Sequence, residues 1–170
     1  MSAEILLRLR LAPDWDRIDL VREAVSLCVE ATFASAGFRD ALAMTTSELL
    51  ENAVKYGRSD TPIDLSIEEL SGQVMVVVSN HISWPSPHAS ALQEHLDWLH
   101  TFDDPKEAYS AALQRGYSTA SIGGLGLVRI AHEGHCTLHC ETSSSGAVTV
   151  FASCEPPAPM VAAALRSEAS

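Results

Sequence analysis

The chain has 170 residues, of which 46% are apolar and 19% charged, as expected of one ordinary globular domain with a substantial core. The net charge of −11, from 22 acidic and 11 basic side chains, argues against binding to nucleic acid or to anionic membranes. The N-terminus carries arginines inside an apolar stretch and does not resemble a signal peptide. No apolar run approaches the length of about twenty residues that crosses a bilayer. We therefore expect a cytoplasmic protein.

The first half of the chain has the periodicity of regular secondary structure. It predicts a strand at 4–11, helices at 14–37 and 39–56, and strands at 62–69 and 73–79. In the first strand, the odd-numbered apolar residues from Ile5 to Leu11 would share one face. Gly37 and Gly57 are interpreted as the stops of the two helices. Ser71-Gly72 predicts a hairpin between the last two strands.

The second half begins with two prolines and a mostly helical segment. It predicts helical structure over about 87–116, a flexible hinge at 115–124, strands at 135–142 and 147–154, and a flexible tail at 155–170. Asp103-Asp104-Pro105 has the pattern of a helix N-cap. Strands in this order, with helices inserted as blocks, favour an α/β two-layer sandwich with helices on one face. We expect its sheet to be mixed and mostly antiparallel, within one domain over 1–154.

One stripe of polar side chains stands out in the helix predicted at 39–56. Glu48, Asn52 and Lys55 are spaced by four and three residues, which places them on one face of a helix. A carboxylate, a neutral oxygen donor and an ammonium group on one stripe could serve as base, Mg²⁺ ligand and phosphate contact. An ordinary amphipathic helix with a solvated polar face is the alternative.

A second motif lies about seventy residues downstream. Gly123, Gly124 and Gly126, with Leu125 between them, directly precede an apolar run at helical spacing. Glycines ahead of a helix let backbone N–H groups approach an anion, and the helix N-terminus adds its positive end. A glycine-rich turn that only starts a buried helix is the alternative, since a lone glycine cluster is weak evidence.

Together, the two motifs resemble the GHKL superfamily of ATP-binding proteins, which has the Bergerat fold. Glu48, Asn52 and Lys55 match its N box, and residues Gly124 to Leu127 match its G2 box. The similarity spans about residues 1–154. In size, the chain looks most like the stand-alone anti-sigma-factor serine kinases, which phosphorylate an anti-anti-sigma partner with a STAS-type fold.

The resemblance implies that ATP and Mg²⁺ bind to this chain. Glu48 would be the catalytic general base, Asn52 the Mg²⁺ ligand and Lys55 a phosphate contact. The phosphates would also be held by the backbone amides of the G2 region, at Gly123, Gly124, Leu125 and Gly126. The segment at 87–116 corresponds to the ATP lid of the superfamily, which is usually mobile.

The chain departs from the superfamily at the G1 box, an Asp-x-Gly-x-Gly that follows a strand. Asn80 stands in place of the aspartate that binds the adenine amine, and Ile82 and Trp84 stand in place of the glycines. An asparagine carbonyl can still accept a hydrogen bond from an amine, which makes Asn80 the candidate adenine contact. Bulky side chains at 82 and 84 oppose the close backbone approach that glycine permits.

Four cysteines complete the inventory of reactive side chains: Cys28, Cys136, Cys140 and Cys154. Without a signal peptide, we expect reduced thiols. On a strand, Cys136 and Cys140 would share a face but lie about 13 Å apart, too far to share one metal ion. Buried strand cysteines are therefore the favoured interpretation.

The sequence leaves two hypotheses of function open. The first is an ATP-dependent serine/threonine protein kinase that acts on a STAS-type regulator, with Glu48, Asn52, Lys55 and the G2 amides as its site. The second is a degenerate, non-catalytic GHKL module that sequesters a partner protein, which the altered G1 box favours. Pairing of the chain with a second copy of itself stays open in both.

Overall fold

The structure, a computed structural model, describes residues 4–116 and 124–156. Five strands, five α-helices and one short 3-10 helix follow one another along these residues. Their bounds are β1 Glu4–Leu11, η1 Trp15–Arg17, α1 Ile18–Thr32, α2 Ala36–Tyr56, β2 Ile63–Leu70, β3 Gln73–His81, α3 Pro87–Leu99, α4 Pro105–Gln114, α5 Gly124–His132, β4 Cys136–Thr142 and β5 Ala147–Cys154. Most of the predicted hinge and of the predicted tail lies outside the described residues.

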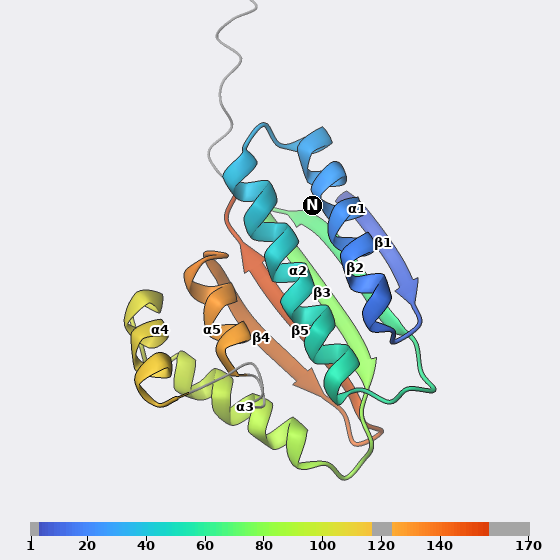
Figure 1. The fold of residues 1–170 in the computed structure, drawn as a ribbon, viewed down its shortest axis with the longest axis vertical. Coiled ribbons are helices and arrows are strands. Elements are labelled where there is room, and N and C mark those ends of the chain that lie inside the picture. The colour runs from blue at the N-terminus through green and yellow to red at the C-terminus, as the bar shows by residue number, and fades with distance from the viewer. Residues whose placement is uncertain (1–3, 117–123, 157–170) are drawn as a thin grey trace, which may run out of the picture.

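The five strands form one sheet in the order β1-β2-β3-β5-β4 (Figure 1). Each of the four pairings is antiparallel. The hairpin predicted between β2 and β3 is confirmed, and both of its turn residues have positive φ, 55° at Ser71 and 83° at Gly72. Along β2, Ile63, Leu65 and Ile67 are buried and alternate with more exposed residues. This alternation leaves one face of the sheet for the core.

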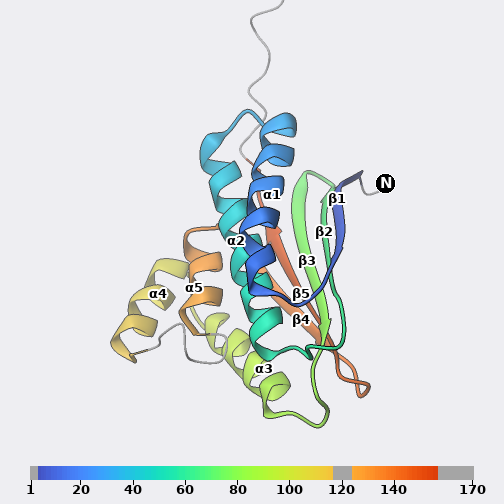
Figure 2. The same cartoon turned by 45° about the vertical axis from the view of Figure 1, so that its right-hand side comes forward.

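The helices cover that one face, and none of the helices within residues 4–116 and 124–156 lies on the other face of the sheet (Figure 2). α1 and α2 lie over β1, β2 and β3, α5 lies over β4, and α4 packs on the outer side of α5. The predicted two-layer α/β sandwich is therefore confirmed. Its main core is a large cluster of apolar side chains from both layers, and Ile82, Ala89 and Val148 form a second, small cluster.

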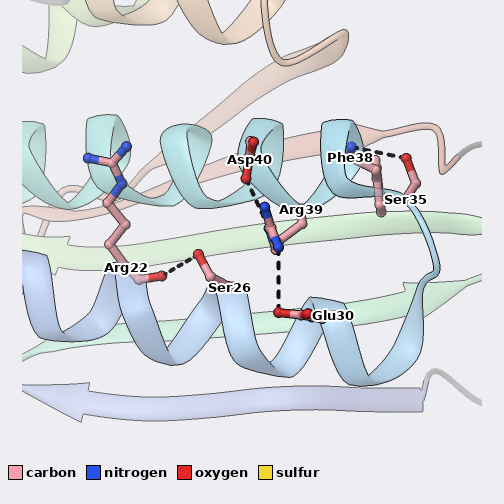
Figure 3. A network of polar contacts seen from close by, with 7 residues as sticks. All are labelled: Arg22, Ser26, Glu30, Ser35, Phe38, Arg39 and Asp40. Atoms are coloured by element: carbon pink, nitrogen blue, oxygen red, sulfur yellow. Dashed lines mark hydrogen bonds and ion pairs between the residues drawn. The ribbon is translucent and has the colours of Figure 1, made fainter.

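The junction of α1 and α2 lies earlier in the chain than predicted, because α1 ends at Thr32 and α2 begins at Ala36. Gly37, predicted as a helix stop, lies in the first turn of α2, because Ser35 already caps that helix by accepting a hydrogen bond from the backbone N–H of Phe38 at 3.3 Å. Arg39 bridges the two helices, with Nη1 3.5 Å from Oε2 of Glu30 and Nε donating to Asp40 at 2.9 Å (Figure 3). These polar contacts orient α1 against α2.

The first strand departs from simple alternation at its start. The register of β1 against β2 shifts between Ile5 and Leu7, which is a β-bulge or a similar irregularity. Ile5 is consequently 52% exposed, whereas Leu7, Leu9 and Leu11 pack against the core. The prediction that Ile5 shares one face with the other odd-numbered apolar residues was therefore wrong.

The helical segment predicted at 87–116 consists of α3 and α4, each capped by its own N-terminal side chain. Ser86 accepts a hydrogen bond from the N–H of His88 at 3.2 Å, and Asp104 accepts from the N–H of Lys106 at 2.8 Å. Proline follows each cap in the first turn. The predicted N-cap at Asp104 is thus confirmed.

Both helices contribute buried side chains to the core. Leu96 of α3 and Ala108 and Ala112 of α4 are at most 1% exposed. At the end of α3, a ring nitrogen of His100 lies 2.9 Å from the carbonyl oxygen of Leu138 in the middle of β4. The segment that was expected to form an ATP lid is therefore part of the second layer.

The cysteines differ from the prediction in one respect. Cys136 and Cys154 lie directly opposite each other on β4 and β5 and form a disulfide. Cys28 and Cys140 are free thiols, and Cys140 is buried, as predicted. The expectation of four reduced thiols was wrong because antiparallel pairing brings together two residues that are 18 positions apart in sequence.

Within residues 4–116 and 124–156, no helix is long and apolar enough to cross a membrane. The same residues contain no group of three or more His, Cys, Asp and Glu side chains that could hold a metal ion.

Candidate functional site

The predicted polar stripe of α2 lines one side of a surface hollow of about 280 Å³. Helix α5 supplies the opposite side with the glycines that begin it, and Trp15 of η1 stands at the edge. The lining residues are Trp15, Glu48, Glu51, Asn52, Lys55, Gly124 and Gly126. The fold thus brings the N-box and G2-box residues, which are about seventy positions apart, to one place.

Glu48 is the most constrained side chain of this hollow. Its Oε1 accepts a hydrogen bond from Nη1 of Arg129 on α5 at 2.7 Å, and its side chain is only 14% exposed. Burial raises the pKa of the Glu48 carboxyl above its ordinary value, and the nearby Arg129 charge opposes that rise. The negative charges of Glu51 and Glu133 raise it further. Such a carboxyl group is suited to exchange a proton.

Gly126 lies against the second oxygen of the same carboxylate. A Cβ atom at position 126 would collide with Oε2 of Glu48. Glycine at this position therefore lets α5 lie close to the Glu48 side chain of α2. The reason for glycine here is this close approach and not a positive φ.

A second hollow adjoins the first and shares Asn52 with it. It lies between α2, the ends of β3 and β5 and the first turns of α3, and its walls are mostly apolar. The lining residues are Leu49, Asn52, Ala53, Tyr56, Val78, Asn80, Ile82, His88, Ala89, Leu92, Leu127, Val148 and Val150. Asn80 therefore reaches the same composite site as Asn52, in the apolar hollow.

Asn80 is buried and already holds a structural hydrogen bond. Its side-chain Nδ2 donates to the carbonyl oxygen of Ala53 in the last turn of α2 at 3.2 Å. The same carbonyl accepts from the N–H of Gly57, which ends α2 as predicted. A Cβ at Gly57 would come within 2.6 Å of Nδ2 of Asn80, so glycine is required there by close approach. The Ala53 carbonyl uses one N–H of the Asn80 amide, and the amide oxygen is the atom that could accept a hydrogen bond from a ligand.

The remaining predicted residues behave differently. The ammonium of Lys55 lies 5.2 Å from the centroid of the Tyr56 ring, at the edge of the polar hollow. Leu125 lines neither hollow and packs instead against the hydrophobic core. Gly123 lies outside the described residues, so its predicted contact with phosphate is untested.

Helix α3 closes the apolar hollow. His95 of α3 is buried, which lowers the pKa of its imidazole, and it forms a hydrogen bond with the backbone of Gly124 at the start of α5. With α3 in this position, the hollow has a free volume of about 50 Å³. Ligand pockets usually have about 300–1,000 Å³.

The polar hollow fits a triphosphate with Mg²⁺, and the apolar hollow fits a base only in part. An amide oxygen, an ammonium group and the backbone N–H groups of a helix N-terminus are the donors and ligands that such a group needs. A planar base would enter the apolar hollow only if α3, which carries His88 and Leu92 in its wall, moved outward.

No family model matches the chain, and no curated protein matches it. Among solved structures, it is similar to a chain in the crystal structure of the SiaB-SiaC complex from Pseudomonas aeruginosa, with a TM-score of 0.69. The match covers 88% of this chain and 89% of that chain at 18% sequence identity. The two chains share a fold. At this identity, the likeness says nothing by itself about shared chemistry.

Several residues around the hollows were missed in the sequence, among them Trp15, Glu51 and Arg129. Trp15 is 53% exposed beside the polar hollow, and nothing in its local pattern connects it with the distant Glu48. Arg129 could have been found, because it follows Gly126 by three residues and therefore lies on the same face of α5.

Proposed function

We propose that this chain is a kinase-like regulatory protein that binds a STAS-type protein partner and transfers a phosphoryl group from ATP to a serine or threonine of it. The observation that carries this proposal is the meeting of two hollows at Asn52. One is polar and lined by Glu48, Lys55 and the first glycines of α5, and the other is apolar with Asn80 in its wall. A nucleotide needs this division between a phosphate end and a base end.

Each side chain of the polar hollow has a part in the proposed reaction. Glu48 takes the proton of the acceptor hydroxyl, since its carboxylate is the base nearest to the G2 glycines. The amide oxygen of Asn52 holds Mg²⁺, which neutralises phosphate charge when it is bound. Lys55 and the N–H groups at the start of α5 hold the phosphates in place. Phosphoryl transfer requires little more than such positioning and charge neutralisation.

A protein partner is supported by the shared fold. The similar chain was solved in a complex named SiaB-SiaC, that is, with a second protein. The net charge of −11 also argues against a nucleic acid as the partner.

A second candidate function is the non-catalytic binding module. Three observations favour it: the free volume of about 50 Å³, the commitment of the Asn80 amide nitrogen to Ala53, and the ion pair of Glu48 with Arg129. In this case, α3 would fill the place of the base permanently, and the chain would act on its partner by binding alone.

Calorimetry with ATP and Mg²⁺ separates the two candidates. The kinase proposal requires ATP binding by the parent chain and its loss in Asn52→Ala, because the Mg²⁺ ligand is gone. Glu48→Gln should still bind ATP but should transfer no phosphate to purified STAS-type proteins of the same organism. Glu30→Gln, an exposed change between α1 and α2, is the matched control. A parent chain that binds such a protein but no ATP at millimolar concentration would establish the binding module instead.

A further inference from the structure

Arg129 is the charged residue that connects helix α5 with the candidate base. Its guanidinium group donates from Nη1 to Glu48 at 2.7 Å and from Nε and Nη2 to Glu133 at 3.3 and 3.1 Å. Three of its nitrogens are thus used by two carboxylates, one on α2 and one on its own helix. The planar fork of arginine is suited to this geometry, and a lysine could not reproduce it.

The position of Glu48 depends on two contacts from the same face of α5. Arg129 holds Oε1, and Gly126, three residues earlier, leaves just enough room for Oε2. Between them, the carboxylate is held in one orientation in the wall of the polar hollow. Arg129 itself does not line that hollow.

The electrostatic surroundings of Glu48 oppose the ionisation of its carboxyl group, and Arg129 favours it. From α2, Glu51 and Lys55 face the same hollow, and from α5, Glu133 adds a negative charge. Tyr109 of α4 adds an electrostatic interaction with Arg129 from the outer side. Burial, Glu51 and Glu133 all raise the pKa of Glu48, and the Arg129 charge and its hydrogen bond lower it.

We propose that Arg129 is a positioning residue for Glu48: it holds the carboxylate in the wall of the polar hollow, where Glu48 receives the proton of the acceptor hydroxyl. The inference rests on the proposed kinase function. In this proposal, α5 has two roles. Its N-terminus contacts the phosphates, and the face that carries Gly126 and Arg129 positions the Glu48 carboxylate.

The pH profile of phosphoryl transfer tests this role in Arg129→Gln. Loss of the positive charge should shift the acidic limb of the profile to higher pH, by about one pH unit. Loss of orientation should lower the plateau of kcat by about tenfold or more. KM for ATP should stay within twofold of the parent, because Arg129 does not line the hollow. Arg58→Gln, which removes a surface arginine paired with Asp60, is the matched control and should change none of these values.

A carboxyl-carbon NMR titration provides a readout that needs no activity. The Glu48 signal, assigned by its absence in Glu48→Gln, should titrate at higher pH in Arg129→Gln than in the parent. Arg129→Lys, which keeps the charge and the helix, covers the case in which the glutamine variant does not fold. It should restore the pH of the acidic limb and leave kcat reduced, since an ammonium group cannot hold both carboxylates.

The outcomes separate this inference from the function on which it rests. An active parent with an unchanged pH profile in Arg129→Gln would overturn the positioning role and leave the kinase proposal standing. A parent without phosphoryl transfer, even with a shifted titration of Glu48, would overturn the kinase proposal and reduce the Arg129 contact to a structural ion pair.

Discussion

Glu48 combines two properties that oppose each other energetically. Its carboxylate is largely buried at the junction of α2 and α5, and burial raises its pKa because a charged group loses hydration there. A general base nevertheless has to be ionised near neutral pH. The 2.7 Å contact with Arg129 offsets part of the loss. The buried carboxylate is therefore expected to lower the free energy of unfolding, a cost that proteins often accept at functional sites.

Glu48→Gln should stabilise the protein at neutral pH. Because the folded-state pKa of Glu48 is raised above the unfolded value, its stabilising contribution is fully present below the unfolded-state pKa and is lost as the pH rises through the folded-state pKa. Glutamine removes this dependence. Urea unfolding should give a gain of about 0.5–2 kcal/mol at pH 7, which vanishes at about pH 4. A difference in the free energy of unfolding between variant and parent that stays constant with pH would contradict the burial of an ionised carboxylate.

Asn80→Asp should destabilise the protein. The Asn80 amide nitrogen donates to the carbonyl oxygen of Ala53 at 3.2 Å, and an aspartate would place a carboxylate oxygen against that carbonyl instead. The lost bond and the repulsion between the two buried oxygens should lower the free energy of unfolding by about 1–3 kcal/mol. Urea unfolding at pH 7 measures this change. An aspartate variant as stable as the parent would show that the Ala53 contact is dispensable.

At the scale of elements, α5 packs closely against Glu48 of α2 at Gly126. Gly126→Ala should destabilise the parent, because the new methyl group meets Oε2 of Glu48, which Arg129 holds in place. In a Glu48→Ala background, the same change should stabilise by up to about 1 kcal/mol, since alanine favours the helix over glycine. A double-mutant cycle by thermal unfolding measures this coupling. An equal effect of Gly126→Ala in both backgrounds would exclude the contact.

Helix α3 is predicted to behave as a core element. Leu96→Ala removes a side chain that is 1% exposed and should lower the free energy of unfolding by about 2–5 kcal/mol. Leu113→Ala on α4 is the matched control, because Leu113 is 53% exposed, and it should stay within about 0.5 kcal/mol of the parent. Similar small effects of both changes would mean that α3 is a loosely held lid.

At the scale of the whole molecule, the disulfide joins the edge strand β4 to β5. It closes a loop between residues 18 positions apart, and a cross-link of this length should stabilise the fold by about 3 kcal/mol. Cys136→Ala should therefore lower the melting temperature under oxidising conditions and remove its sensitivity to dithiothreitol. Cys28→Ala, at a free thiol, is the control and should keep that sensitivity. A parent that melts at the same temperature with and without reductant would contradict the bond.

Much of the fold could be predicted because local patterns determine it. The alternation of β2, the turn at Ser71-Gly72 and the cap at Asp104 all have causes within a few residues of chain. The errors arose where a distant or competing contact decides. Gly37 was predicted as a helix stop, but the cap at Ser35 places it in the first turn of α2. Ile5 was predicted to share a face with Leu7, but the register of β1 against β2 shifts between these two residues.

The sequence by itself determined the two-layer order of elements and the polar stripe of Glu48, Asn52 and Lys55, because the period of a helix or strand is a local property. Only the tertiary structure decided what surrounds that stripe. The contact of Glu48 with Arg129 spans 81 positions, and that of Asn80 with Ala53 spans 27. The physical reason is that burial, register and the free volume under α3 depend on how the layers pack, and no short stretch of sequence contains that information.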